Sequence, residues 1–116
     1  MEKNFTTRTG LIIGDEGINK LKGSHVIVFG VGGVGSFAAE AIARAGVGNL
    51  TIVDFDEVDI TNINRQLPAL HSTVGKYKVE VMKDRILDIN PNINIKAIAI
   101  IFNLNHLLLF IFSPCF

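Results

Sequence analysis

An apolar segment that runs directly into a glycine-rich turn is the feature that most constrains how this chain folds. Residues 26–29 read Val-Ile-Val-Phe, the continuous apolar pattern of a strand buried on both faces. Gly30, Gly32 and Gly35 follow in a G-x-G-x-x-G pattern, and a helical apolar period begins after them. These glycines allow a tight turn, a close backbone approach to a phosphate and close packing of a helix on a strand. The stretch predicts a strand, a phosphate-binding turn and a helix, in that order.

A carboxylate at the end of the next apolar segment favours a nucleotide as the ligand of this turn. Residues 50–53 read Leu-Thr-Ile-Val, and Asp54 follows them. At that position in a strand-helix-strand unit, a carboxylate can accept hydrogen bonds from ribose hydroxyl groups. A glycine turn that only packs a helix against a strand is the alternative, which the glycine pattern alone leaves open.

The rest of the chain continues the alternation of helix and strand. The further elements that we expect are helices over residues 16–22 (capped by Asp15), 37–45 and 75–89, and a third strand over residues 94–101. The side chains expected to face inward are Phe37, Ala38, Ala41, Ile42 and Ala45 on the second helix, and Val79, Met82, Ile86 and Ile89 on the third. The order βαβαβ predicts an α/β fold, a Rossmann-like, doubly wound parallel sheet with right-handed crossovers, of which the chain holds the nucleotide-binding half.

Charge and composition exclude several classes of function. Eleven basic side chains balance eleven acidic ones among 116 residues, so no overall charge favours nucleic acid or an anionic membrane as a partner. One cysteine, Cys115, cannot form an internal disulfide bond and suits a reducing compartment. The amino-terminal residues lack the apolar stretch of a secretory signal. We therefore expect a single cytoplasmic domain.

The polar segment between residues 54 and 66 bears on the kind of nucleotide chemistry. A hydride-transfer enzyme needs only a cradle for the pyrophosphate of its cofactor, whereas phosphate chemistry needs cations that stabilise charge on phosphoryl oxygens. Arg65 in this segment and Lys78 beyond it can supply these cations. The alternative for both is a solvated side chain without a ligand, and their spacing alone does not decide.

Four motifs together resemble a known family. They are Gly30-x-Gly32-Gly33-Val34-Gly35-Ser36, Ala45-Gly46-Val47-Gly48-Asn49-Leu50, Asp54-Phe55-Asp56 and Thr61-Asn62-x-Asn64-Arg65-Gln66. The chain resembles the ThiF/MoeB/ubiquitin-activating superfamily of adenylating enzymes, and within it the bacterial tRNA threonylcarbamoyladenosine dehydratases. The resemblance extends from Phe5 to Ala97.

This resemblance implies a role for each matching position. The positions implied to bind the nucleotide are Gly30, Gly32, Gly33, Gly35, Asp54, Asp56, Asn62, Asn64, Arg65 and Lys78. Within this set, Gly33 would lie against the phosphates and Asp54 would bind the ribose. Asn62, Asn64 and Arg65 would hold the phosphates, while Lys78 would reach the leaving pyrophosphate.

A reaction and its partners are implied as well. ATP and Mg²⁺ would convert a carboxylate into an acyl-adenylate, with Arg65, Lys78 and Arg8 as catalytic residues. Arg8 matches an arginine that reaches across a homodimer into the neighbouring site. In the dehydratases the carboxylate is the threonyl group of threonylcarbamoyladenosine in tRNA, which cyclises with loss of water. Activation of a ubiquitin-like sulfur carrier, in a sulfur relay, is one alternative. A catalytically inactive nucleotide-binding fragment, or a dinucleotide-binding module, is the alternative from another class.

The carboxyl-terminal end departs from the family pattern. No charged side chain follows Lys96, and residues 98–116 are rich in apolar side chains. About 15 apolar positions fall short of the roughly 20 residues that span a membrane, so no membrane partner is expected. We expect an ATP-binding domain over residues 1–97 and a divergent tail over residues 98–116 that reflects a frameshift or truncation. The magnesium carboxylate of the family would lie in the missing part.

Overall fold

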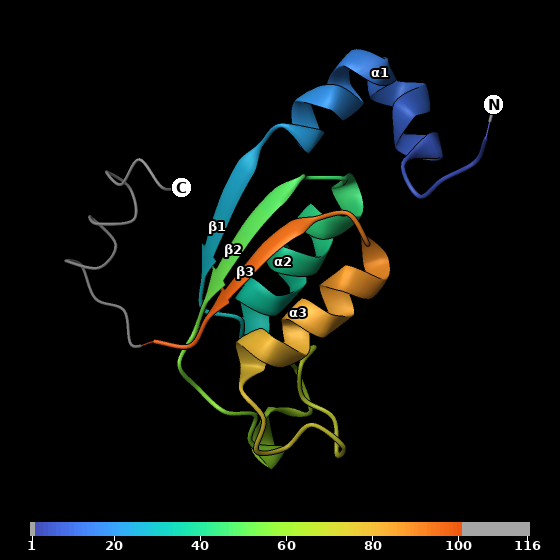
Figure 1. The fold of residues 1–116 in the computed structure, drawn as a ribbon. Helices are drawn as coiled ribbons and strands as arrows, with labels where there is room; N and C mark the ends of the chain where they lie inside the picture. Colours follow the sequence, from blue (N-terminus) through green and yellow to red (C-terminus); the bar gives the residue numbers. More distant parts are fainter. Residues whose placement is uncertain (1, 101–116) are drawn as a thin grey trace.

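The computed structural model describes residues 2–100 of the chain and contains helices and strands in alternation (Figure 1). The elements are α1 (Thr7–Lys22), β1 (His25–Phe29), α2 (Gly33–Ala45), β2 (Asn49–Val53), the 3-10 turn η1 (Ile60–Asn62), α3 (Lys78–Ile89) and β3 (Asn94–Ile98). Among these residues no helix is long and apolar enough to cross a membrane.

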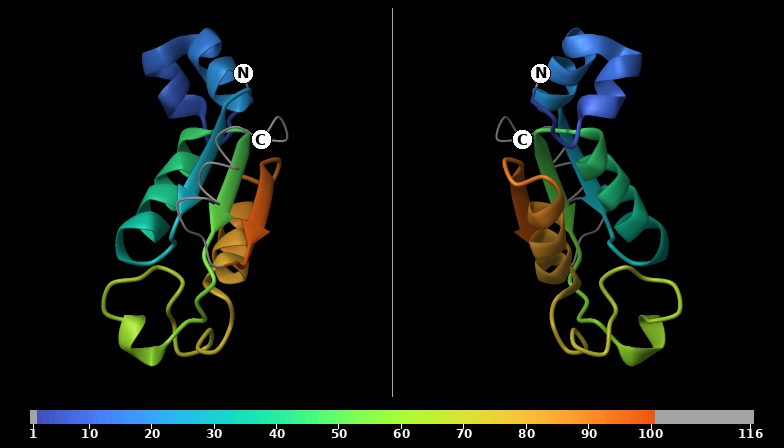
Figure 2. Two further views of the ribbon diagram at one scale, coloured as in Figure 1. Left: turned by 90° about the vertical axis from the view of Figure 1, so that its left-hand side faces the viewer. Right: turned by 90° about the vertical axis from the view of Figure 1, so that its right-hand side faces the viewer.

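The three strands form one parallel sheet in the order β1-β2-β3. Val26 of β1 is in register with Leu50 of β2, and Leu50 with Ile95 of β3. Because consecutive strands are neighbours, both right-handed crossovers run in the same direction, and α2 and α3 lie on one face of the sheet (Figures 1 and 2). The predicted α/β fold with a parallel sheet is confirmed, and the described residues form one winding of it.

The hydrophobic core lies between this face of the sheet and the two crossover helices. Its largest fully buried side chains are Val31, Leu50, Ile52, Val79, Met82 and Ile86. The inward face predicted for α3 is confirmed at Val79, Met82 and Ile86. Asn90, which ends α3, donates hydrogen bonds from Nδ2 to the carbonyl oxygens of Ala43 and Val47 at 3.3 and 3.2 Å, and so joins the ends of α3 and α2.

The inward face predicted for α2 is confirmed at Ile42, which packs against the core, and is wrong at Phe37 and Ala41. Phe37 is 54% exposed and Ala41 is exposed, while Ser36, Ala39 and Ala43 face the core. The reason is the contact at the start of the helix, because a Cβ at Gly35 would overlap the carbonyl oxygen of Gly30. This close approach fixes the rotation of α2 about its axis and turns its small side chains toward the sheet.

Three predicted boundaries also differ from the structure. The first helix begins at Thr7, with a kink at Gly14 (φ 71°, ψ 175°), and the predicted helix from residue 16 is its second half. The third helix begins at Lys78, since Gly75 has a left-handed φ of 88° that cannot start a helix. The third strand ends at Ile98.

Candidate functional site

The glycine turn lies at the carboxyl end of β1 and leads directly into α2. Gly30 has a φ of 85°, and its N–H donates to the carbonyl oxygen of Val53 at 2.7 Å, which ties the turn to the end of β2. The first backbone hydrogen bond of α2 runs from Ser36 N–H to the carbonyl oxygen of Gly32. The N–H groups of residues 33–35 precede it, and no side chain caps this end of the helix. An uncapped helix start with three free donors is suited to an anion.

Asp54 is buried, and its carboxylate organises the turn. Its Oδ2 accepts a hydrogen bond from Val31 N–H at 2.9 Å, and its Oδ1 accepts one from Asp56 N–H at 2.8 Å. The carboxylate therefore holds the glycine turn and the start of the following loop together. Each oxygen keeps a further lone pair, so the predicted bond to ribose is compatible with these contacts and stays a prediction.

The loop between β2 and α3 extends beyond the carboxyl ends of the strands (Figures 1 and 2). A capping box stabilises η1 inside it: Asp59 accepts from Thr61 N–H at 2.8 Å, and Asn62 Oδ1 accepts from Asp59 N–H at 2.9 Å. The Thr61 hydroxyl also donates to Asp59 at 2.6 Å, and this bond and the N–H bond lower the pKa of Asp59. Asn62 is buried, and its side chain is part of the loop's own structure.

Arg65 is exposed in this loop and is positioned by its neighbours. Its Nη1 donates to the carbonyl oxygen of Thr61 at 3.1 Å and to Oδ1 of Asn64 at 3.0 Å. A guanidinium carries five N–H donors in a fixed plane, so donors remain for a phosphate. The predicted pair Asn64 and Arg65 is thus brought together by the structure.

Lys78 is a buried cation at the first position of α3. Its side chain is 7% exposed, and its Nζ lies 3.7 Å from Oδ2 of Asp56, whose side chain is 52% exposed. The N–H of Lys78 also donates to the carbonyl oxygen of Asp56 at 3.0 Å. At 3.7 Å the ion pair is longer than a hydrogen bond, so the ammonium keeps donors for a further acceptor.

Arg8 is not brought near these residues within one chain. It is exposed on α1, which lies beyond the amino ends of the strands, whereas the glycine turn and the loop lie at their carboxyl ends (Figure 1). Its predicted role across a homodimer stays a prediction.

Two residues that contact the glycine turn were not among the predicted site residues. Ser36 is fully buried, and its Oγ donates to the carbonyl oxygen of Gly32 and accepts from Leu67 N–H at 3.4 Å. Gln66 lies against Gly32, because a Cβ added there would be 3.4 Å from Nε2 of Gln66. The adjacency of Gln66 to Arg65 in the sequence was the signal that could have identified it.

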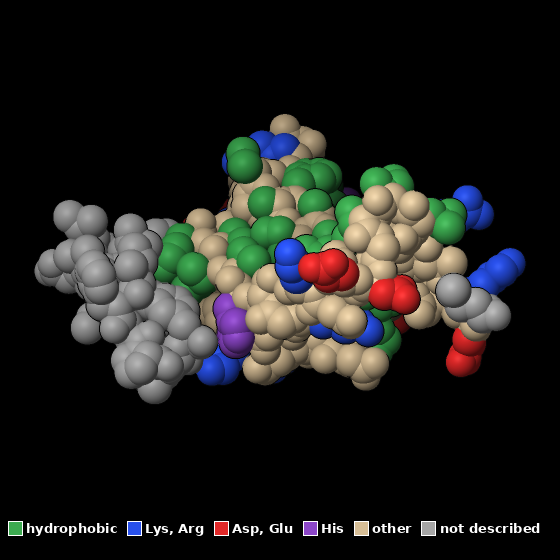
Figure 3. Space-filling view, turned by 90° about the horizontal axis from the view of Figure 1, so that it is seen from above, with side chains coloured by type: hydrophobic (Ala, Val, Ile, Leu, Met, Phe, Trp, Pro, Cys, Tyr) green, Lys and Arg blue, Asp and Glu red, His purple; other side chains and the backbone are tan. Residues whose placement is uncertain are grey.

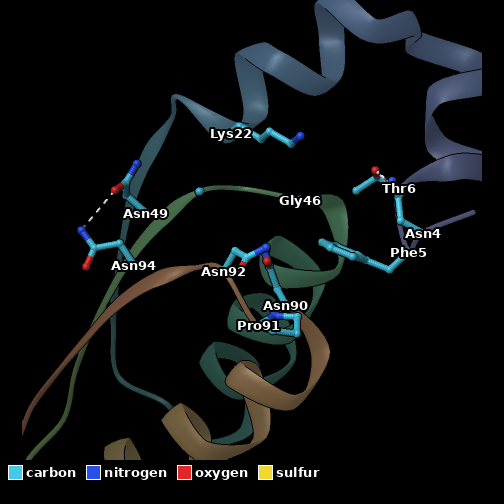
Figure 4. Close-up of a pocket in the computed structure, with 11 residues that line it drawn as sticks. Asn4, Phe5, Thr6, Lys22, Gly46, Asn49, Asn90, Pro91, Asn92 and Asn94 are labelled. Carbon is cyan, nitrogen blue, oxygen red and sulfur yellow. Dashed lines mark hydrogen bonds between the residues drawn. The ribbon is translucent and has the colours of Figure 1, made fainter. Parts of the chain in front are cut away.

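A cavity of about 620 Å³ lies at the other end of the sheet (Figure 4). Its lining includes five asparagines, Asn4, Asn49, Asn90, Asn92 and Asn94. This end carries the amino ends of the strands, so the cavity is separate from the glycine turn.

The surface of α1 mixes apolar and charged side chains. Seen from above, apolar side chains lie between charges of both signs (Figure 3). Leu11 and Ile12 of α1 are 83% and 87% exposed.

Comparison with known proteins adds to this geometry. A sequence profile of the ThiF family matches residues 6–111. The tRNA threonylcarbamoyladenosine dehydratase of Bacillus subtilis is 59% identical over 96 residues, which are 83% of this chain and 38% of that protein. The molybdopterin-synthase adenylyltransferase of Escherichia coli is 45% identical over 83 residues, which are 72% of this chain and 33% of that protein.

A solved structure shares the fold. The structure of E. coli tRNA N6-threonylcarbamoyladenosine dehydratase in complex with ATP matches with a TM-score of 0.88 at 37% identity, covering 92% of this chain and 44% of that one. This chain therefore spans less than half the length of its relatives. The family profile continues past Ala97, and the boundary predicted there stays a prediction; residues 101–116 lie outside the described residues. With a family profile over most of its length and a shared nucleotide-binding fold, the chain belongs to the ThiF family.

Proposed function

We propose that this chain is the ATP-binding part of an enzyme that activates a carboxylate by adenylation. The observation that carries the proposal is the uncapped start of α2 at the same end of the sheet as Arg65 and the buried Lys78. A triphosphate needs both free N–H donors and cations, and these residues provide them. Binding of ATP by a solved relative supports the same assignment.

The chemistry requires positioning and charge stabilisation more than it requires a protein nucleophile. A carboxylate oxygen of the substrate attacks the α-phosphorus, the bond to the bridging oxygen breaks, and pyrophosphate leaves as the acyl-adenylate forms. Negative charge develops on the leaving oxygens, and Lys78 and Arg65 are the described cations suited to stabilise it. In-line transfer of this kind depends mainly on such preorganised groups.

Magnesium is not provided for by the described residues alone. Residues 2–100 contain no group of three or more His, Cys, Asp or Glu side chains that could hold a metal ion. Asp56, the carboxylate nearest to Lys78, is paired with that lysine. A magnesium carboxylate in a further part of the protein remains a prediction.

For the substrate, we favour threonylcarbamoyladenosine in tRNA, with cyclisation and net loss of water after adenylation. The 59% identity to the B. subtilis dehydratase supports this choice. Activation of a ubiquitin-like sulfur carrier is the second candidate, supported by the 45% identity to the E. coli adenylyltransferase. A homodimer in the cytoplasm that uses Arg8 of each chain at the other's site is part of the same proposal.

Ligand selectivity tests the nucleotide class. We expect ATP, and not NAD, to raise the melting temperature of the chain, because a ligand that binds only the folded state adds about 2.7 kcal/mol of stability at 100 times its Kd. Stabilisation by NAD without ATP would reject adenylation and favour a dinucleotide-binding module.

Turnover tests the substrate. We expect AMP and pyrophosphate to form from ATP in the presence of tRNA that carries threonylcarbamoyladenosine, and not with tRNA that lacks it. Turnover that depends on a sulfur carrier protein would support the second candidate. Binding of ATP without turnover on either substrate would support the inactive nucleotide-binding fragment.

A further inference from the structure

Among the buried side-chain nitrogen and oxygen atoms of residues 2–100, only one atom, in Gln66, has no hydrogen-bond partner. Its Oε1 is buried without a hydrogen-bond partner, and the residue is 9% exposed. Buried acceptors are nearly always paired, since an unpaired one loses its hydrogen bonds to water on folding and gains none. A side chain that keeps such an atom therefore needs an explanation other than stability.

The position of Gln66 connects it to the glycine turn. Its carboxamide lies against Gly32, with Nε2 as the atom nearest to the turn. The next residue, Leu67, donates its N–H to Oγ of Ser36, which in turn donates to the carbonyl oxygen of Gly32. The backbone around Gln66 is thus fixed to the same turn that presents the free N–H groups of α2.

Packing alone does not account for a carboxamide here. A methionine has nearly the same length and would fill the space beside Gly32 with no unpaired acceptor. Asn90, the buried carboxamide at the opposite end of the sheet, contrasts with Gln66 because its Nδ2 donates to two carbonyl oxygens. A role in binding a ligand would explain why a side chain with a buried, unpaired oxygen occupies this position.

We propose that Gln66 contacts the phosphates of the bound nucleotide through its side-chain N–H₂. The inference rests on the proposed ATP-binding function and adds a residue to that site. Nε2 is already the carboxamide atom nearest to the turn, so it can donate to a phosphate oxygen held at the start of α2 without a change in its orientation. This contact with the ligand offsets the cost of keeping Oε1 buried without a partner, and it couples the polar loop to the glycine turn.

Nuclear magnetic resonance on the unaltered 116-residue chain tests this contact directly. Gln66 is the only glutamine in the sequence, so selective ¹⁵N-glutamine labelling leaves one side-chain amide to observe. We expect ATP and tripolyphosphate to shift this signal, and adenosine to leave it in place. If ATP binds and the signal does not move, the contact is absent and the inference fails while the proposed function stands. If ATP does not bind at all, the proposed function fails first.

Variants separate a binding role from a packing role. We expect Gln66→Met to raise the Kd for ATP about tenfold, which corresponds to 1.4 kcal/mol, with the Kd for adenosine within about twofold. The melting temperature should be unchanged or higher, because the unpaired acceptor is gone. The matched control Asn90→Ala should lower the melting temperature and leave the ratio of the two Kd values unchanged. Equal weakening of ATP and adenosine by Gln66→Met would assign Gln66 to packing.

Discussion

At the scale of single residues, the candidate site is arranged by hydrogen bonds that exist before a ligand arrives. Asp54 accepts from the N–H groups of Val31 and Asp56, and Arg65 donates to its neighbours Thr61 and Asn64. Such groups need little reorganisation when charge develops, which is the condition for effective electrostatic stabilisation. The site is therefore preorganised around the glycine turn.

Lys78 should be the single cation that matters most for ATP affinity. We expect Lys78→Met to raise the Kd for ATP by about 10- to 100-fold, because hydrogen bonds to charged groups contribute roughly 1.5–3 kcal/mol. The fold should persist, since methionine keeps the buried stem. Isothermal titration calorimetry measures the effect. Lys83→Met is the matched control on the same helix, with no ion pair among the described contacts, and should change the Kd less than about twofold. Equal losses from both variants would show a general charge effect.

Asp59 should make the loop sensitive to acid. Its pKa is lowered in the folded chain by the Thr61 hydroxyl and N–H, so it contributes stability above the unfolded pKa of about 3.9 and loses it as the pH falls through the lower folded value. Hydrogen exchange of the Thr61 backbone amide should therefore become faster below about pH 4 than the exchange rate of an unprotected amide at the same pH would account for. In the Asp59→Asn variant this extra increase in rate should disappear. If the increase remained in the variant, a group other than Asp59 would be responsible for it.

At the scale of elements, the contact between β1 and α2 determines how the helix packs. Periodicity alone predicted an inward face with Phe37 and Ala41, yet both are exposed. Alanines and serine can lie on either face of a helix, so the hydrophobic pattern of α2 is weak. The close approach of Gly35 to Gly30 determines which face of α2 packs against the sheet. By contrast, the strong pattern of Val79, Met82 and Ile86 allowed the face of α3 to be predicted correctly.

Two glycines of the turn should respond differently to the same substitution. Gly35→Ala places a methyl group on the carbonyl oxygen of Gly30, so we expect a loss of about 3 kcal/mol or more in the free energy of unfolding. Gly33→Ala meets no atom within 4 Å and should change stability by less than about 0.5 kcal/mol. It should weaken ATP binding, because its methyl group would occupy the space that we propose for the phosphates. Urea denaturation and ATP titration measure the two effects. Similar unfolding curves for both variants would contradict the packing argument.

At the scale of the whole molecule, one face of the sheet carries both crossover helices, and no helix of the described part covers the other face. Leu11 and Ile12 on α1 are also exposed. The relatives are more than twice as long as the matched segment, so residues beyond it are available in them to cover such surfaces. Large exposed apolar surfaces favour association.

The purified chain should therefore be marginally stable or should associate. We expect a broad thermal transition and a concentration-dependent apparent mass in analytical ultracentrifugation, because the β1 and β3 edges are unpaired in the described part and apolar side chains such as Leu11 and Ile12 are exposed. ATP should sharpen the transition by stabilising the folded state. A sharp, cooperative melt of a monomer without ligand would contradict this expectation.

The sequence by itself determined the order of strands and helices, the glycine turn, and the cations Arg65 and Lys78, because buried strands, glycine spacing and motif residues are local signals. Only the tertiary structure decided which face α2 buries, that Asp54 binds the turn's own backbone, and that Gln66 lies against Gly32 with an unpaired oxygen. These features depend on contacts between segments far apart in the chain, and such contacts leave no period in the sequence. The apolar run before the glycines predicted where the proposed nucleotide site lies, and the packing around it established which side chains lie beside the turn.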